Sequence, residues 1–189
     1  MFFLPSIHRH AAFREGAREM VPLATGIEYH NGSLFLATNT KILRWDSVDG
    51  RLDNLGEPKV IYDKLPGGTD HSWKYLRIRD NKLYYAVGAP CNICDPGEWA
   101  KIYRMNLDGS GLETLASGVR NTVGFDFDPK TGNLWFTDNG RDWFSEELPN
   151  DELNVVTKPG QQHFGYPFCH QGNVPDPEFG WGKSCSDYV

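Results

Sequence analysis

The sequence predicts an all-β fold of the β-propeller type, and three observations support this prediction. Aromatic residues make up 13% of the chain and 20 of its 189 residues are glycine, which is typical of strands joined by tight turns. Apolar residues alternate with period two in strand-like segments, as at Phe125 and Phe127. A strand–turn–strand pattern recurs three times, with anchoring leucines Leu34, Leu83 and Leu134 spaced 49 and 51 residues apart. Strand repeats of about 50 residues are typical of propeller blades.

Each repeat predicts a hairpin of inner strands followed by further strands toward the outside of the blade. The first hairpin turns at Asn31-Gly32, which begins a formal glycosylation sequon but is explained by a type I′ turn. No long amphipathic helix is evident. The hairpins are expected at 26–37, 75–86 and 123–136, third strands at 41–45 and 101–106, and outer strands at 60–62 and 112–115.

The length of the chain is that of one domain with one core. Three blades do not close a ring, since propellers usually have about four to eight. Either the two ends of the chain belong to incomplete blades, or the chain is a piece of a longer protein, which we favour. We expect residues 1–189 to form a single partial propeller domain of about three to four blades, with 1–20 as a poorly defined N-terminal segment and 168–189 as an irregular, cysteine-containing tail.

Composition argues against two classes of partner. The net charge is -6 and no dense cluster of Lys and Arg occurs, which argues against nucleic acid. No apolar run approaches the roughly 20 residues that span a bilayer. The N-terminus lacks the basic start and longer apolar stretch of a clear secretory signal.

Two loops place polar residues just before inner strands, where a propeller has its central channel. His71 ends a glycine-rich loop, and a histidine there can act as a general base near neutral pH. The alternative is a structural histidine bonded to loop backbone. Arg120 and Asn121 lie at the same place one blade later, where they can present a cation and an amide to an anionic, carbonyl-bearing ligand. Arg120 alone could equally bridge two blades.

The segment after the second strand of the third repeat is expected to be a long polar loop that runs from Asp138 and is closed by residues 151–154. Its carboxylates and carbonyls are the hard oxygen ligands that Ca²⁺ prefers, although no EF-hand spacing is present. The alternative is a solvated acidic loop.

The four cysteines allow two interpretations. Cys91 and Cys94 form a CxxC motif, while Cys169 and Cys185 lie apart in the tail. We favour a disulfide within each pair, which fits an extracytoplasmic protein. The alternative is a Zn²⁺ site formed with His170.

Several motifs together resemble one known family. These are His71 with its glycine-rich approach, GVRNTVGFDFDP, LWFTDNGRDW, DELN and HFGYPFCHQG. Over roughly residues 20–185 the chain resembles the soluble quinoprotein sugar dehydrogenases, in particular the glucose/sorbosone dehydrogenase branch. The resemblance implies a six-bladed propeller that uses pyrroloquinoline quinone (PQQ) and Ca²⁺ to oxidise a sugar, and passes electrons to an external acceptor. It also implies a fragment of a periplasmic or secreted protein.

The same resemblance assigns roles to residues. His71 matches the family's catalytic base, and Arg120 and Asn121 match residues that contact the quinone oxygens. Gly140 lies where a backbone carbonyl helps to hold the cofactor's Ca²⁺, and Gly140-Arg141 stands in place of the usual Gly-Pro, so Arg141 joins the cofactor-binding set.

A second, structural Ca²⁺ completes the set that the resemblance implies. Glu152 matches one of its ligands, and Phe164, which replaces the family's tyrosine, retains only a backbone carbonyl for this metal. Two rival functions are a non-catalytic propeller that serves as a binding module and a Ca²⁺-dependent lactonase on a similar propeller.

Overall fold

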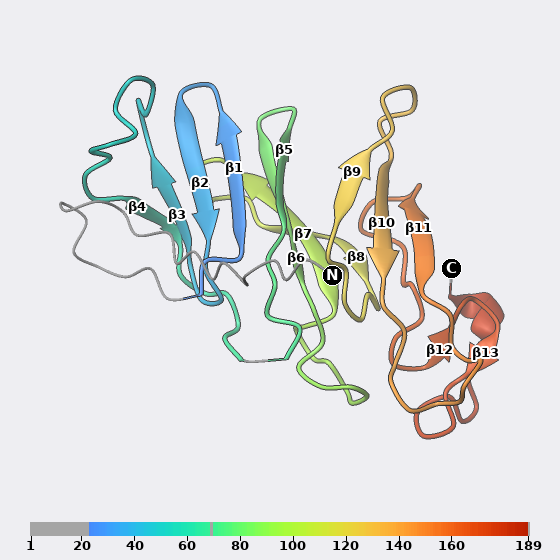
Figure 1. Ribbon diagram of the computed structural model, residues 1–189. Helices are drawn as coiled ribbons and strands as arrows, with labels where there is room; N and C mark the ends of the chain where they lie inside the picture. Colours follow the sequence, from blue (N-terminus) through green and yellow to red (C-terminus); the bar gives the residue numbers. More distant parts are fainter. Residues whose placement is uncertain (1–22, 69, 189) are drawn as a thin grey trace, which may run out of the picture.

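The computed structural model describes residues 23–68 and 70–188, so the expectations for the segment 1–20 lie outside the described residues. Three antiparallel sheets follow one another along the chain and lie side by side as successive blades (Figure 1). The predicted β-propeller fold is confirmed, as three blades that do not close a ring within the described residues. The first blade is β1 (Gly26–His30), β2 (Ser33–Ala37), β3 (Ile42–Trp45) and β4 (Lys59–Tyr62); the second is β5 (Leu76–Arg79), β6 (Lys82–Val87), β7 (Lys101–Asn106) and β8 (Glu113–Ser117); the third is β9 (Phe125–Phe127), β10 (Leu134–Asp138) and β11 (Glu152–Val156).

The hairpin turns follow from their sequences. Asn31 and Gly32, between β1 and β2, have φ values of 46° and 74°, as the expected type I′ turn requires. Asp80 and Asn81 have φ values of 50° and 56° in the corresponding turn of the second blade. Asparagine, aspartate and glycine tolerate this left-handed backbone better than other residues, so these positions fix where each hairpin reverses.

The core lies between the blades, and the period-two alternation of β6 builds it on both sides. Leu83 and Tyr85 face the first blade, whereas Tyr84 and Ala86 face the third. Because both faces of the middle sheet are buried, it holds its two neighbours in place; each large buried side chain contributes about 1.5–3 kcal/mol. The partners include Phe35, Ala37 and Ile42 in the first blade and Phe125, Leu134 and Phe136 in the third.

One expectation for the third blade was wrong. Residues 152–154 do not close a loop but begin strand β11, which pairs with β10 so that Glu152 lies opposite Asp138 and Val156 opposite Leu134. The segment alternates like a strand, and its one fully inward residue, Val156, is 2% exposed. The acidic residues of the preceding loop concealed this short apolar signal.

The tail is more ordered than an irregular segment. Strands β12 (Cys169–His170) and β13 (Val174–Pro175) pair with each other, and a 3-10 turn, η1 (Cys185–Asp187), follows. Within the described residues, no helix has the length and apolar character needed to cross a membrane.

Candidate functional site

His71 and Arg120 come together through the backbone of one residue, Ala89, just after β6. The Nδ1 atom of His71 lies 2.8 Å from the Ala89 carbonyl oxygen, and the Ala89 N–H donates to the Arg120 carbonyl at 2.7 Å. Gly88 permits this approach, because a Cβ atom there would lie 2.5 Å from the His71 Cβ. The structure therefore brings together two residues that lie 49 positions apart in the sequence.

The environment of His71 suits a base. A bond from Nδ1–H to the Ala89 carbonyl assigns the proton to Nδ1 and leaves the Nε2 lone pair free. Burial lowers the pKa of His71 below its usual value and the nearby Arg120 charge lowers it further, against the effect of the bond to Ala89. The imidazole is therefore neutral at pH 7 and able to accept a proton.

Arg120 is a buried cation, with 4% of its surface exposed. Its guanidinium is held from two sides, by Asn92 of the β6–β7 loop and by Asn139 and Asp142 of the β10–β11 loop. Arg120 thus combines both readings of its sequence position, because it bridges two blades and also lines a pocket.

Asp138, at the end of β10, fixes the backbone of the Arg-Asn pair. Its carboxylate accepts the N–H groups of Arg120 and Asn121 at 2.9 and 2.6 Å, while the Asn121 side chain donates to Asn139 at 3.2 Å. Burial raises the pKa of Asp138 to about 7, and the negative charge of Glu152 adds to this effect. The sequence analysis placed Asp138 at the start of the oxygen-rich loop and missed its contact with Arg120 and Asn121, although its period-two position behind Leu134 and Phe136 indicated that it points inward.

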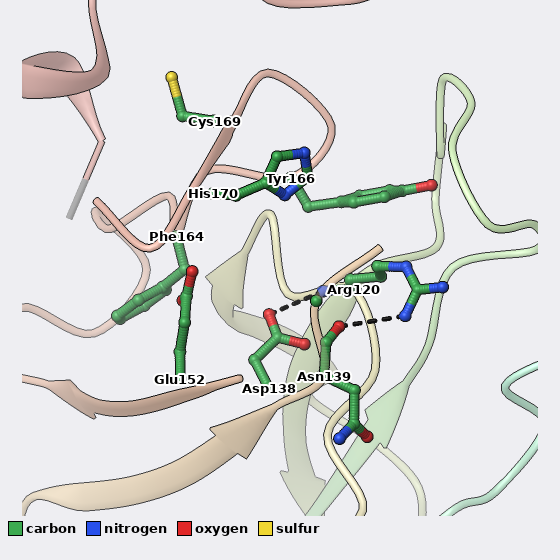
Figure 2. A pocket seen from close by; sticks show the side chains of 9 residues that line it. Arg120, Asp138, Asn139, Glu152, Phe164, Tyr166, Cys169 and His170 are labelled. Atoms are coloured by element: carbon green, nitrogen blue, oxygen red, sulfur yellow. Dashed lines mark hydrogen bonds between the residues drawn. The ribbon is translucent and has the colours of Figure 1, made fainter. Parts of the chain in front are cut away.

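A small pocket lies beside this carboxylate. Figure 2 shows the side chains that line it, among them Asp138 of β10, Glu152 of β11 and His170 of the tail. It brings together four of the predicted site residues with others that were not predicted. The lining consists of Arg120, Asp138, Asn139, Gly140, Glu152, Phe164, Tyr166, Cys169 and His170.

The donor set of the pocket fits a hard cation. In the part of the chain that the structure describes, the carbonyl oxygens of Gly140 and Phe164 accept no hydrogen bond. The carboxylates of Asp138 and Glu152 repel each other there, and a divalent cation would relieve this repulsion. No group of three or more His, Cys, Asp or Glu side chains is clustered in metal-binding fashion among the described residues, so backbone carbonyls would have to complete the coordination.

Arg141 lies apart from the pocket lining. Its guanidinium donates to Asp176 at 2.7 Å and to Glu178 at 2.9 Å, so it is engaged with the tail. Asp176 also accepts from His170 Nε2 at 2.8 Å. Asp176 and Glu178 lie 35 and 37 residues after Arg141 in the sequence, so no local sequence signal indicated these contacts.

The cysteines form the two expected disulfides, Cys91–Cys94 and Cys169–Cys185. All four thiols are used, so the alternative of a Zn²⁺ site with thiolate ligands is wrong. The second bridge closes a loop of 16 residues around β13 and joins the tail to the pocket through Cys169.

Three consecutive antiparallel sheets, with a buried arginine and several oxygen-bearing residues around a small pocket, define the chain as part of a β-propeller. The family model for glucose/sorbosone dehydrogenases matches residues 29–179. The chain therefore belongs to the glucose/sorbosone dehydrogenase family.

Known proteins resemble the chain over part of their length. A relative from Borreliella burgdorferi, called an uncharacterized protein, is 32% identical over 160 residues, which are 78% of this chain and 42% of that protein. The calcium structure of a Trichoderma reesei carbohydrate-active enzyme of family AA12 has a TM-score of 0.73 at 17% identity and covers 87% of this chain. The holo PQQ domain of pyranose dehydrogenase from Coprinopsis cinerea has a TM-score of 0.64 at 20% identity and covers 81%. This chain spans 53% and 44% of those two structures, about half of each.

Proposed function

We propose that the chain is part of a PQQ- and Ca²⁺-dependent oxidoreductase that oxidises an aldose or related sugar, of the sorbosone or glucose type, at a C–OH group. The observation that carries the proposal is the Ala89 peptide, which holds a neutral histidine base beside a buried arginine. Family membership and the fold shared with a PQQ domain support it. We further propose that residues 1–189 make up a single partial propeller domain.

We propose a role for each residue, which its position in the structure supports. His71 Nε2 takes the proton of the sugar hydroxyl, because its Nδ1 is already bonded to Ala89. Arg120 supplies positive charge beside the oxygens of an anionic cofactor, and the Asn121 amide adds a polar contact. When bound, PQQ would supply the hydride acceptor and Ca²⁺ would supply a Lewis acid. Asp138 holds the backbone of Arg120 and Asn121 in register.

The pocket residues are proposed as the cation ligands. Gly140 would contribute its carbonyl to the cofactor's Ca²⁺, and Glu152 with the Phe164 carbonyl would hold a structural Ca²⁺. Support comes from their convergence on one pocket and from the Ca²⁺ in the structure of the family AA12 enzyme. Arg141, which the sequence placed in the cofactor-binding set, is instead proposed to hold the tail against this region.

Two further features complete the proposal. The two disulfides indicate an oxidising compartment, so we place the protein in the periplasm or outside the cell. We also propose that the protein would need an external electron acceptor as a partner.

Reconstitution tests the proposal. The protein is loaded with PQQ and Ca²⁺, and reduction of a redox dye is followed on addition of glucose or sorbosone. We expect sugar-dependent dye reduction that is lost in His71→Ala and retained in His30→Ala, a histidine that bonds Asn81 far from the pocket. Quenching of tryptophan fluorescence by PQQ measures binding independently. Absence of both quenching and dye reduction would favour a non-catalytic binding module instead.

A further inference from the structure

The loop that joins β6 to β7 makes an unusual double contact with Arg120 through a single residue, Asn92. The Asn92 backbone carbonyl accepts from Arg120 Nε at 2.9 Å, and its side-chain carbonyl accepts from Arg120 Nη2 at 2.8 Å. Nε and Nη2 lie on one edge of the planar guanidinium, so two acceptors on one residue fix the orientation of that plane.

Asn92 also binds the facing loop of the third blade at two points. Its Oδ1 accepts from the Asp142 N–H at 2.7 Å, and its Nδ2 donates to the Asp142 carbonyl at 3.0 Å. The Asn92 amide thus both accepts from and donates to the backbone of Asp142, as a paired strand would, and links two neighbouring blades. The Asn92 Oδ1 accepts from both Arg120 and Asp142, and one Nδ2–H donates to Asp142, so the contacts need an acceptor and a donor on the same short side chain.

The remaining N–H groups of the Arg120 guanidinium face the β10–β11 loop or have no acceptor in the described part of the chain. Arg120 Nη1 donates to the Asn139 carbonyl at 3.1 Å, and Nη2 has a longer contact to the Asp142 carboxylate at 3.4 Å. A guanidinium has five N–H donors. Among the described residues, acceptors are present for four of them, which leaves one N–H on Nη1 for a ligand.

The Asn92 loop is itself anchored. Its neighbour Cys91 is bridged to Cys94, and the buried Tyr166 hydroxyl accepts the Cys94 N–H at 3.1 Å and lies 3.4 Å from Cys91 Sγ. Tyr166 lines the pocket. The disulfide restricts the conformations of the loop, and the tyrosine fixes the loop against the tail, so Asn92 is presented to Arg120 in one position.

From these contacts we infer that Asn92 is a positioning residue: held by the Cys91–Cys94 disulfide and Tyr166, it orients the Arg120 guanidinium so that one Nη1–H points to the anionic cofactor. The inference rests on the proposed function for the identity of that cofactor, PQQ. The orientation of Arg120 does not depend on it and is measurable in the free protein.

The first measurement follows the Arg120 Nε–H by NMR in the ¹⁵N-labelled chain, with its signal assigned by loss in Arg120→Lys. Asn92→Leu keeps the size of the side chain but removes Oδ1 and Nδ2, and we expect hydrogen exchange of the Nε–H to become about 10- to 100-fold faster. Asn92→Asp retains the acceptor for Arg120 and for the Asp142 N–H and loses only the donor to the Asp142 carbonyl, and we expect exchange of the Arg120 Nε–H to stay within about threefold of wild type. Asn54→Leu, at an exposed turn, is the matched control and should change nothing.

The second measurement titrates the same proteins with PQQ and Ca²⁺ by tryptophan fluorescence, and we expect a Kd about 10- to 100-fold weaker in Asn92→Leu. Cys91→Ser/Cys94→Ser removes the disulfide that holds the Asn92 loop and leaves Asn92 itself unchanged. It should also make hydrogen exchange of the Arg120 Nε–H faster, which keeps the test valid if Asn92→Leu does not fold. Unchanged exchange in both variants, or equal PQQ affinity in wild type and Asn92→Leu, would overturn the inference. If exchange is faster in Asn92→Leu but no variant and no wild-type protein binds PQQ, the positioning of Arg120 by Asn92 is upheld and the proposed function is overturned.

Discussion

Asp176 and Glu178 bind the same guanidinium, that of Arg141, from very different surroundings, and this contrast gives a sharp prediction. The Asp176 side chain is fully buried and Glu178 is 58% exposed, while Arg141 itself is 8% exposed. Asp176→Asn should therefore destabilise the fold strongly, and Glu178→Gln should have almost no effect.

The magnitudes follow from burial. Asp176 accepts from Arg141 and His170 through one oxygen and from the N–H groups of Glu178 and Phe179 through the other. An asparagine would turn N–H groups toward donors and leave Arg141 buried without its main countercharge, which costs about 3–5 kcal/mol. Loss of an exposed partner costs less than about 1 kcal/mol.

Urea unfolding of the two variants at pH 7 checks both values. Although burial opposes ionisation, the hydrogen bonds from His170 and Arg141 hold the pKa of Asp176 below its usual range. Its contribution is therefore present above the unfolded pKa, near 4, and is lost as the pH falls through the lower folded value. The difference in free energy of unfolding between wild type and Asp176→Asn should therefore decrease in that acid range. Equal losses in the two variants at pH 7 would refute the reasoning.

Three further predictions concern the disulfide of the tail, the titration of His71 and the core. Cys169→Ser/Cys185→Ser should lower the free energy of unfolding by about 3 kcal/mol through loop entropy, since the bridge spans 16 residues; a loss below about 1 kcal/mol in urea melts would contradict this. The NMR titration midpoint of His71 should lie below 6.5 and move upward in Arg120→Gln, because burial and then the Arg120 charge disfavour its protonation; an unchanged midpoint would show that the charge is not felt. Phe136→Ala, at a side chain 1% exposed and packed edge-on against Phe164, should cost about 3–5 kcal/mol, whereas Trp135→Ala, 41% exposed on the opposite face of β10, should cost far less when both are measured by thermal unfolding.

The blades were predictable because their signals are local. Asn31-Gly32 fixes a hairpin and the alternation around Leu34, Leu83 and Leu134 fixes the inner strands, so neither needs knowledge of distant residues. Strand β11 was missed because its apolar positions are few and acidic residues precede it. A single buried residue, Val156, is a weak signal next to a carboxylate-rich segment.

The site was predictable only in part. The sequence motifs singled out His71, Arg120 and Glu152, whose roles remain predictions. The contacts that arrange them cross long stretches of chain or use backbone atoms, such as the 28 residues between Asn92 and Arg120. Asn92 was hidden inside the CxxC motif, where the cysteines carry the recognisable pattern. Tertiary contacts of this kind have no periodicity that a sequence shows.

The link through Ala89 has a consequence for how this site tolerates mutation. His71 and Arg120 are joined through the backbone of Ala89. These hydrogen bonds are therefore kept when Ala89 is replaced by any residue small enough for its fully buried position. Proline at position 89 is the exception, because it has no N–H to donate to Arg120. A single mutation could remove a polar side chain in that role, whereas the backbone N–H and carbonyl are present for every residue except proline, which lacks the N–H. The distance between His71 and Arg120 is therefore set by the backbone after β6 and is insensitive to most side-chain changes there, with Gly88 as an exception.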